Sequence, residues 1–250
     1  MAGKRRRPGC LIVSAVLVAL LVGAYLLVDG GLRAFAEGQA ANQIDSALPA
    51  SVTGDVTVSI GGASVIAQYF SGRFDRVELT APAITAEGIP ASVHIIATDV
   101  EPRLGGTIGQ MQATVDLTAE TLNTLAHSTG TPAETTLELG TNEVTYVGSL
   151  SFAGIPIGYR ATATPSVTAS SLVFTPTAAE VTTGVGGFDV SALLPTVLGQ
   201  APISVCVADF VPQEVAVSSV RVTPERARIT LESSTLVLTQ QSLTTLGACS

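Results

Sequence analysis

Lysine and histidine are scarce in this chain of 250 residues, and their scarcity excludes several kinds of chemistry. Lys4 is the only lysine, so the chain has no Walker-type loop, whose lysine contacts the phosphates of a nucleotide. The two histidines, His94 and His127, lack the companion ligands and the spacing of a zinc site. The chain also lacks a G-x-S-x-G nucleophile motif, and its acidic residues are scattered singly. The sequence therefore gives no metal, cofactor or catalytic centre, and we expect a protein that is not an enzyme.

Positive charge is rare outside the N-terminal end of the chain. Residues 4–7 are all basic, whereas the 222 residues after Val28 contain eight arginines and 20 acidic residues, a net charge of −12. A nucleic-acid-binding protein needs a basic stripe, so this composition excludes a nucleic-acid partner. The near absence of lysine and the abundance of alanine, valine, threonine and glycine are typical of a high-GC bacterial genome, and we expect an actinobacterial source.

A single long apolar run, Leu11 to Val28, follows the basic cluster. Eighteen residues rise about 27 Å as a helix, close to the hydrocarbon thickness of a bilayer, about 30 Å. Because positive charge stays on the cytoplasmic side, we expect the N-terminus inside the cell and everything after Val28 outside.

Three regions follow from this topology. We expect residues 1–10 to form a basic cytoplasmic leader, residues 11–28 a transmembrane signal anchor, and residues 29–250 an exported domain in the cell envelope. The protein would then be a single-pass protein of the plasma membrane, with its C-terminal domain in the periplasm. The alternative is cleavage after Ala36, because Ala34-Phe35-Ala36 has the pattern of a signal-peptidase site, and secretion of the domain.

Two cysteines, Cys206 and Cys249, belong to the exported part. In an oxidising compartment a disulfide between them is the expected state. The alternative, a nucleophilic Cys206, lacks a partnering motif around either histidine.

Alternating apolar and polar residues predict that most of the exported part is strand. Val56, Val58 and Ile60 alternate with polar residues, and turn residues at 140–142 separate two further alternating runs, as in a β-hairpin. Short helices are predicted at residues 30–48, 64–71, 118–127 and 189–198. The expected fold class is α+β, mostly antiparallel β, preceded by one transmembrane helix.

One local constellation suggests a ligand. Gly61-Gly62 precedes the helix at 64–71, and Arg73 and Arg76 follow it. A helix N-terminus can receive an anion, and the planar guanidinium group suits phosphate. We therefore expect an anionic phospholipid here, with its phosphate on Arg73 and Arg76 and its acyl chain on the apolar helix faces. The expected acyl-chain contacts are Val65, Ile66, Tyr69, Phe70, Leu122, Leu125, Leu193, Leu194 and Leu198. The alternative is core packing of the helix, with surface ion pairs from Arg73 to Asp75 or from Arg76 to Glu78.

Two stretches resemble a known family. The stretch from Val58 to Gly62, then Gln68-Tyr69-Phe70-Ser71-Gly72-Arg73-Phe74-Asp75-Arg76-Val77-Glu78-Leu79-Thr80, resembles the opening of the actinobacterial LmeA-like phospholipid-binding family. The ending from Val220-Arg221-Val222-Thr223 to Leu231, after Cys206 and Pro212, also fits. The resemblance covers roughly residues 30–250, through degenerate motifs that carry no catalytic residues.

The resemblance implies an envelope protein that binds phospholipids, phosphatidylinositol species included, and that supports the maturation of lipid-anchored mannans. It also implies a fold similar to tubular lipid-binding proteins, in which a long curved antiparallel sheet wraps on a few helices around an apolar groove. We therefore expect a phospholipid-binding or lipid-transfer protein. The alternatives are an interaction protein or scaffold for an envelope glycosyltransferase, and an enzyme acting on lipids whose catalytic groups converge only in space.

Overall fold

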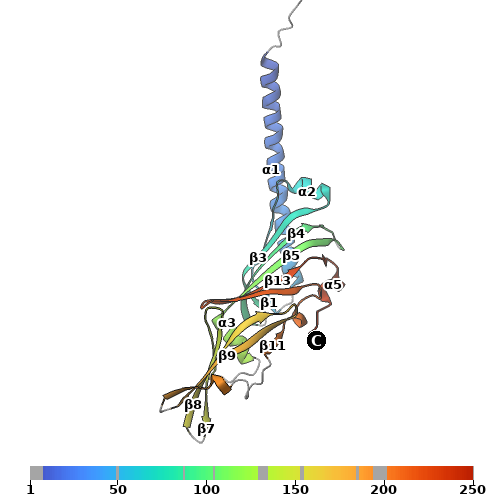
Figure 1. Cartoon of the computed structure of the whole chain (residues 1–250). Coiled ribbons are helices and arrows are strands. Elements are labelled where there is room, and N and C mark those ends of the chain that lie inside the picture. The colour runs from blue at the N-terminus through green and yellow to red at the C-terminus, as the bar shows by residue number, and fades with distance from the viewer. Residues whose placement is uncertain are drawn as a thin grey trace, which may run out of the picture.

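One long helix leads into two antiparallel sheets in the computed structural model (Figure 1). The structure describes residues 8–48, 51–86, 88–103, 105–128, 135–152, 155–183, 186–193 and 202–249. The helix, α1 (Pro8–Ala47), runs without a break through Gly30 and Gly31, so the apolar run and the helix expected after it form one element. Its segment Val16–Ser46 is long and apolar enough to cross a membrane. The basic cluster at residues 4–7 lies outside the described residues.

The first half of α1 stands away from the sheets, whereas its second half packs on them (Figure 1). Apolar side chains between Val16 and Val28 are mostly exposed to solvent in the isolated chain. In contrast, Ala40, Ala41 and Ile44 contact the sheet through the buried residues Val56 and Val58. The helix is therefore both a candidate membrane span and a structural part of the folded domain.

Sheet A contains eight strands, all paired antiparallel, in the order β1-β3-β4-β5-β13-β12, with β2 on β3 and β14 on β5. Its strands are β1 (Val52–Thr53), β2 (Thr57–Ile60), β3 (Phe74–Ala86), β4 (Ile89–Val100), β5 (Thr107–Thr118), β12 (Ala216–Val222), β13 (Arg226–Ser233) and β14 (Leu236–Val237). Because β13 pairs with β5, the end of the chain completes the sheet that its beginning starts.

Sheet B is the long meander that the alternation and turn residues predict. Its strands are β6 (Thr136–Leu139), β7 (Val144–Phe152), β8 (Ile155–Val167), β9 (Ser171–Thr183), β10 (Gly186–Asp189) and β11 (Ile203–Cys206). The other elements that the described residues form are α2 (Val65–Ser71), α3 (Ala119–Ser128), α5 (Gln240–Thr244) and the 3₁₀ turns Ser191–Leu193 and Ala208–Phe210. The prediction of an α+β fold, mostly antiparallel, is confirmed. Of the helix expected at 189–198, the described residues include only the 3₁₀ turn and, before it, the end of β10.

Helix α3 connects the two sheets. Thr118 caps it by accepting a hydrogen bond from the Thr121 backbone nitrogen at 3.1 Å. The Thr121 hydroxyl donates to Pro90 O at the start of β4, in sheet A. On the other side, the Asn123 side chain accepts from Leu137 N at 2.6 Å and donates to Leu137 O at 2.9 Å. Asn123 therefore satisfies the backbone of β6, in sheet B, as a neighbouring strand would.

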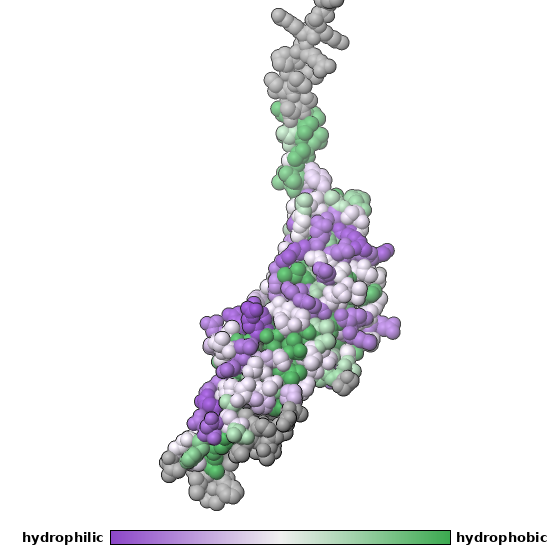
Figure 2. Space-filling view, viewed as in Figure 1, coloured by the Kyte–Doolittle hydropathy of each residue, from purple (hydrophilic) through white to green (hydrophobic). Residues whose placement is uncertain are grey.

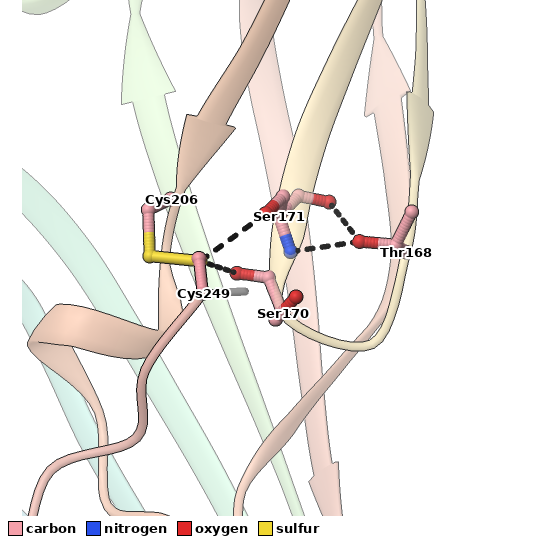
Figure 3. The surroundings of a disulfide bond; sticks show 5 residues. All are labelled: Thr168, Ser170, Ser171, Cys206 and Cys249. Carbon is pink, nitrogen blue, oxygen red and sulfur yellow. Dashed lines mark hydrogen bonds between the residues drawn. A yellow bond between two sulfur atoms is a disulfide. The ribbon is translucent and has the colours of Figure 1, made fainter.

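The expected disulfide joins Cys206 to Cys249 and ties the C-terminal segment to β11 across a sequence separation of 43 residues (Figure 3). Cys249 Sγ also lies 3.3 Å from Ser171 Oγ, at the start of β9. A closed loop of this length contributes about 4 kcal/mol on the chain-entropy model. The bond therefore holds the segment that contains Cys249 against the edge of sheet B.

Candidate functional site

The two faces of sheet A differ sharply in polarity. From β3 to β13 the register places odd-numbered residues opposite one another: Leu79 pairs with Ile95, Ile95 with Ala113, and Ala113 with Leu231. Because side chains alternate along a strand, these apolar residues share one face, the inner face, on which α1 packs. Even-numbered residues such as Glu78, on the outer face, are largely polar.

Part of this inner face is only half-covered. We call it the inner strip, formed by Val77, Leu79, Val93, Ile95, Met111 and Val115, all half-buried. On one side α1 covers Val58 and Ala81 through Ile44. On the other side Val167 and Leu172, from the β8–β9 hairpin, pack against the cluster that contains Ala113 and Leu231. The inner strip is therefore an apolar surface flanked by a helix and a hairpin.

Among the described residues, large apolar side chains such as Val217 and Leu236 are buried, but none of them is completely shielded from solvent. Thr121 is the largest side chain of the described residues that is less than 2 % exposed. Domain interiors normally bury Leu, Ile, Val and Phe almost completely. In sheet B, Tyr146 and Tyr159 stack at 5.8 Å between ring centroids but are also only half-buried. Covering such partly open apolar surface with a ligand is favourable by about 25 cal/mol of free energy for each Å² removed from water.

The outer face of sheet A carries ion pairs. Glu78 receives hydrogen bonds from His94 and Arg76, which hold its pKa below the usual range. Asp116 accepts two hydrogen bonds from Arg228, at 2.7 and 2.8 Å, and this pairing lowers the pKa of Asp116. A shallow cleft of about 620 Å³ on this face is lined mostly by polar side chains, including Arg76. Figure 2 shows hydrophilic colour over this part of the sheet.

Helix α2 begins as the sequence predicts, but an internal anion occupies its N-terminus. Ser64 caps the helix by accepting from Ala67 N at 3.1 Å, and Gly62 precedes it with a φ of +91°, which favours glycine. Asp29 Oδ1, on α1, accepts from Ser64 Oγ at 2.7 Å and from Ile66 N at 3.0 Å. The anion at this helix N-terminus is thus the Asp29 carboxylate, where the sequence suggested a lipid phosphate.

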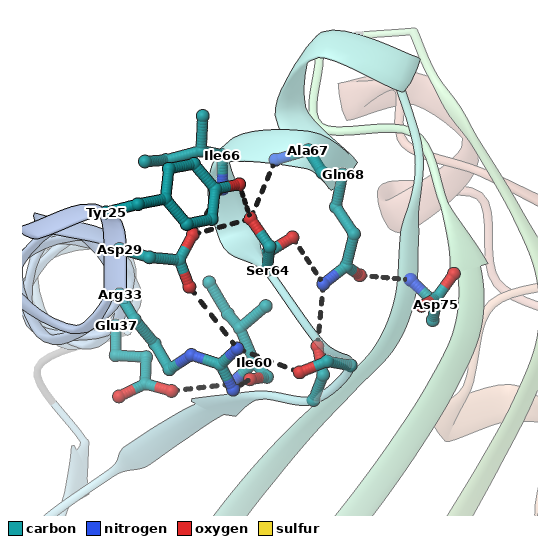
Figure 4. A network of polar contacts seen from close by, with 12 residues as sticks. Tyr25, Asp29, Arg33, Glu37, Ile60, Ser64, Ile66, Ala67, Gln68 and Asp75 are labelled. Carbon is teal, nitrogen blue, oxygen red and sulfur yellow. Dashed lines mark hydrogen bonds and ion pairs between the residues drawn. The ribbon is translucent and has the colours of Figure 1, made fainter. Parts of the chain in front are cut away.

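Three charged residues of α1 hold this junction together, and we call Asp29, Arg33 and Glu37 the α1 latch (Figure 4). Arg33 donates to Ile60 O at 2.7 Å and to Gly62 O at 2.8 Å. Glu37 accepts from Ile60 N at 2.7 Å. Sequence reasoning missed the latch, although its signal is visible: the three residues recur every four positions, on one helix face, immediately after the apolar run.

The predicted contacts on α2 divide into buried and exposed residues. Val65 is buried and Ile66 half-buried, whereas Tyr69 is 65 % and Phe70 84 % exposed. The helix therefore packs through Val65 and Gln68, with both aromatic rings directed away from the core. Gly72 ends the helix in a left-handed conformation.

Both predicted phosphate ligands form ion pairs with acidic side chains. Arg73 pairs with Asp99 and with Glu101, the latter at 3.1 Å, so the pairing with Asp75 offered as an alternative is wrong. Arg76 pairs with Glu78 at 3.2 Å, as that alternative predicted, and lies on the outer face, opposite the inner strip.

The expected acyl-chain contacts do not gather in one place. Helix α2 precedes Phe74, which pairs with Val100, whereas α3 bonds to Pro90, ten residues away along β4. At about 3.3 Å per residue these two ends of sheet A are roughly 33 Å apart. On α3, Leu122 is half-buried and Leu125 exposed. The Leu193 side chain, Leu194 and Leu198 lie outside the described residues.

Comparison with known proteins gives one family. The family model described as LmeA-like phospholipid-binding matches residues 27–232, which include the second half of α1, sheet B, and sheet A except β14 and the last residue of β13. No curated protein and no solved structure matches the chain.

Proposed function

This chain belongs to the LmeA-like phospholipid-binding family, and we propose from that premise that its inner strip holds the acyl chains of a bound phospholipid. The observation that supports this most directly is the incomplete cover of Leu79, Ile95, Met111 and Val115 between α1 and the β8–β9 hairpin. A lipid chain there would remove apolar surface from water without any charged contact. We keep the half-buried Leu122 of α3 as a further proposed contact of the acyl chain, because α3 bonds to the start of β4.

For the head group we propose selectivity for anionic lipid through Arg73, with phosphatidylinositol as one candidate. Arg73 lies beside Tyr69 and Arg103 in a hollow of about 380 Å³ at the α2 end of sheet A. To bind a phosphate, Arg73 would have to give up part of its ion pairing with Asp99 and Glu101. We do not assign this role to Arg76, because its side chain lies on the polar outer face.

For the topology we propose an uncleaved anchor at residues 11–28, with residues 29–250 on the extracytoplasmic side. The exposed apolar half of α1 and the disulfide between Cys206 and Cys249 support this arrangement. Cleavage after Ala36 would separate Asp29 and Arg33 from the domain and leave the N-terminus of α2 without its carboxylate. The α1 latch therefore argues against cleavage.

For the cellular role we propose that the protein carries phospholipid within the envelope and so supports lipid or lipoglycan metabolism. Native mass spectrometry of the full chain, released from detergent, with lipid extraction alongside, tests this. Stoichiometric phospholipid is the expected result and identifies the head group. A protein free of lipid that also takes up none from vesicles would overturn the proposal in favour of an interaction protein for an envelope glycosyltransferase.

A further inference from the structure

Two neighbouring aromatic rings project from α2 into solvent. Tyr69 is 65 % exposed and Phe70 84 % exposed, and the rings meet edge to face with centroids 6.0 Å apart. Single exposed apolar residues are ordinary on protein surfaces. A pair of this kind on a short projecting helix is suited to a membrane interface, where aromatic side chains gather.

The α1 latch fixes the position of these rings along the axis of α1, relative to the end of the apolar run. Asp29, the first residue after that run, binds Ser64 and Ile66 at the start of α2. One turn earlier, Tyr25 OH lies 2.6 Å from Ser64 Oγ. Helix α2 therefore projects from α1 at the level where the apolar run ends (Figure 1), and Figure 2 shows hydrophobic colour on both.

The charged groups around the pair are balanced. Arg73 and Arg103 line the hollow beside Tyr69, and Asp99 and Glu101 pair with them. Asp75 lies close to Gly62, which precedes the helix. Because these described residues carry no excess of positive charge, attraction to a membrane at this point would come from the rings themselves.

We propose that Tyr69 and Phe70 enter the interfacial layer of the extracytoplasmic leaflet, so that α2 is a second membrane contact beside α1. This rests on the proposed anchoring by residues 11–28. Because α1 and sheet A are already fixed to each other, the second contact would keep the whole domain from turning about the α1 axis and hold the α2 end of the sheet against the bilayer. The occupant of this surface is the lipid interface itself, rather than a single lipid in a binding site.

The chain contains no tryptophan, so one introduced indole reports on its own surroundings. The full chain carrying Phe70→Trp is reconstituted in phosphatidylcholine vesicles with lipids brominated near the head-group end of the acyl chains. The matched control is Phe210→Trp, since Phe210 is also an exposed phenylalanine, 80 % exposed, in a 3₁₀ turn beyond β11. We expect blue-shifted emission and at least twofold quenching for Phe70→Trp, and neither for Phe210→Trp.

Equal, unquenched emission from both variants would overturn the proposal. A blue shift for Phe70→Trp that grows with protein density and without bromine quenching would overturn it in favour of a contact between two copies of the chain. Bound phospholipid is measured on the same samples by mass spectrometry. Quenching without bound lipid would contradict the proposed function but support the membrane contact. Bound lipid without quenching would support the proposed function but overturn the membrane contact.

Discussion

Asp29 Oδ1 accepts a hydrogen bond from Ser64 Oγ at 2.7 Å, and this contact joins the end of the apolar run to the first helix of the domain. Asp29 is only 5 % exposed, although it lies one residue beyond Val28. The helix that we propose as the membrane anchor therefore also completes the fold of the domain that follows it. The candidate membrane span and the folded domain therefore share one continuous helix.

We expect Asp29→Ala to loosen α2. The substitution leaves Ser64 Oγ without its acceptor and the Ile66 amide without its partner at the helix N-terminus. Hydrogen exchange followed by mass spectrometry should show faster exchange of the amides of Val65–Ser71 and a lower unfolding midpoint. The matched control is Asp45→Ala, at an exposed carboxylate on the same helix. Equal exchange in the two variants would contradict the role of the latch.

We expect Arg73→Ala to weaken binding of anionic phospholipid by roughly two- to fivefold, the size of an exposed charge contact. Binding of neutral phospholipid should change little. Arg76→Ala is the matched control, because Arg76 lies on the outer face and pairs with Glu78. Vesicles with and without phosphatidylinositol give the comparison. Equal loss of both lipids in Arg73→Ala, or an equal effect of Arg76→Ala, would remove the head-group assignment.

Stability should depend on pH through Asp116. Hydrogen bonds from Arg228 hold the folded-state pKa of Asp116 below its ordinary value, near 3.8, so the pair contributes stability above that value and loses it as the pH falls further. We therefore expect Asp116→Asn to lower the unfolding midpoint at pH 7 but to approach the parent protein at pH 2–3. Glu225→Gln, at an exposed neighbouring carboxylate, is the control. If Asp116→Asn lowered the unfolding midpoint by the same amount at both pH values, the stabilising role of the Asp116–Arg228 pair would be contradicted.

The sequence predicted most strands because their alternation is local. The meander of sheet B follows from alternating residues and from turns such as the one before Glu143. The pairing of β5 with β13 is not predictable in this way, because Asp116 and Arg228 are 112 residues apart along the chain. The same limit explains why the inner strip was not anticipated residue by residue. Alternation indicates which residues share a face, but not how much of that face another element covers.

The candidate site on α2 shows the other limit. The spacing of the apolar residues predicted one apolar helix face of Val65, Ile66, Tyr69 and Phe70; Val65 is buried, but Tyr69 and Phe70 are exposed. It gave no sign that α1 would supply the carboxylate at the helix N-terminus, because that contact depends on how α1 continues into the domain. The one sequence signal for this contact is that Asp29, Arg33 and Glu37 lie on one face of the same helix.

The central claim, that phospholipid lies on the inner strip, is tested most directly by two substitutions at adjacent positions of β4. Ile95 belongs to the inner strip, and Ile96 lines the cleft on the outer face. The phospholipid bound per full chain is measured by native mass spectrometry for Ile95→Trp and Ile96→Trp, with circular dichroism to confirm that both fold. We predict at least a threefold loss of bound lipid in Ile95→Trp and none in Ile96→Trp. Unchanged lipid in a folded Ile95→Trp protein, or loss only in Ile96→Trp, would contradict the account.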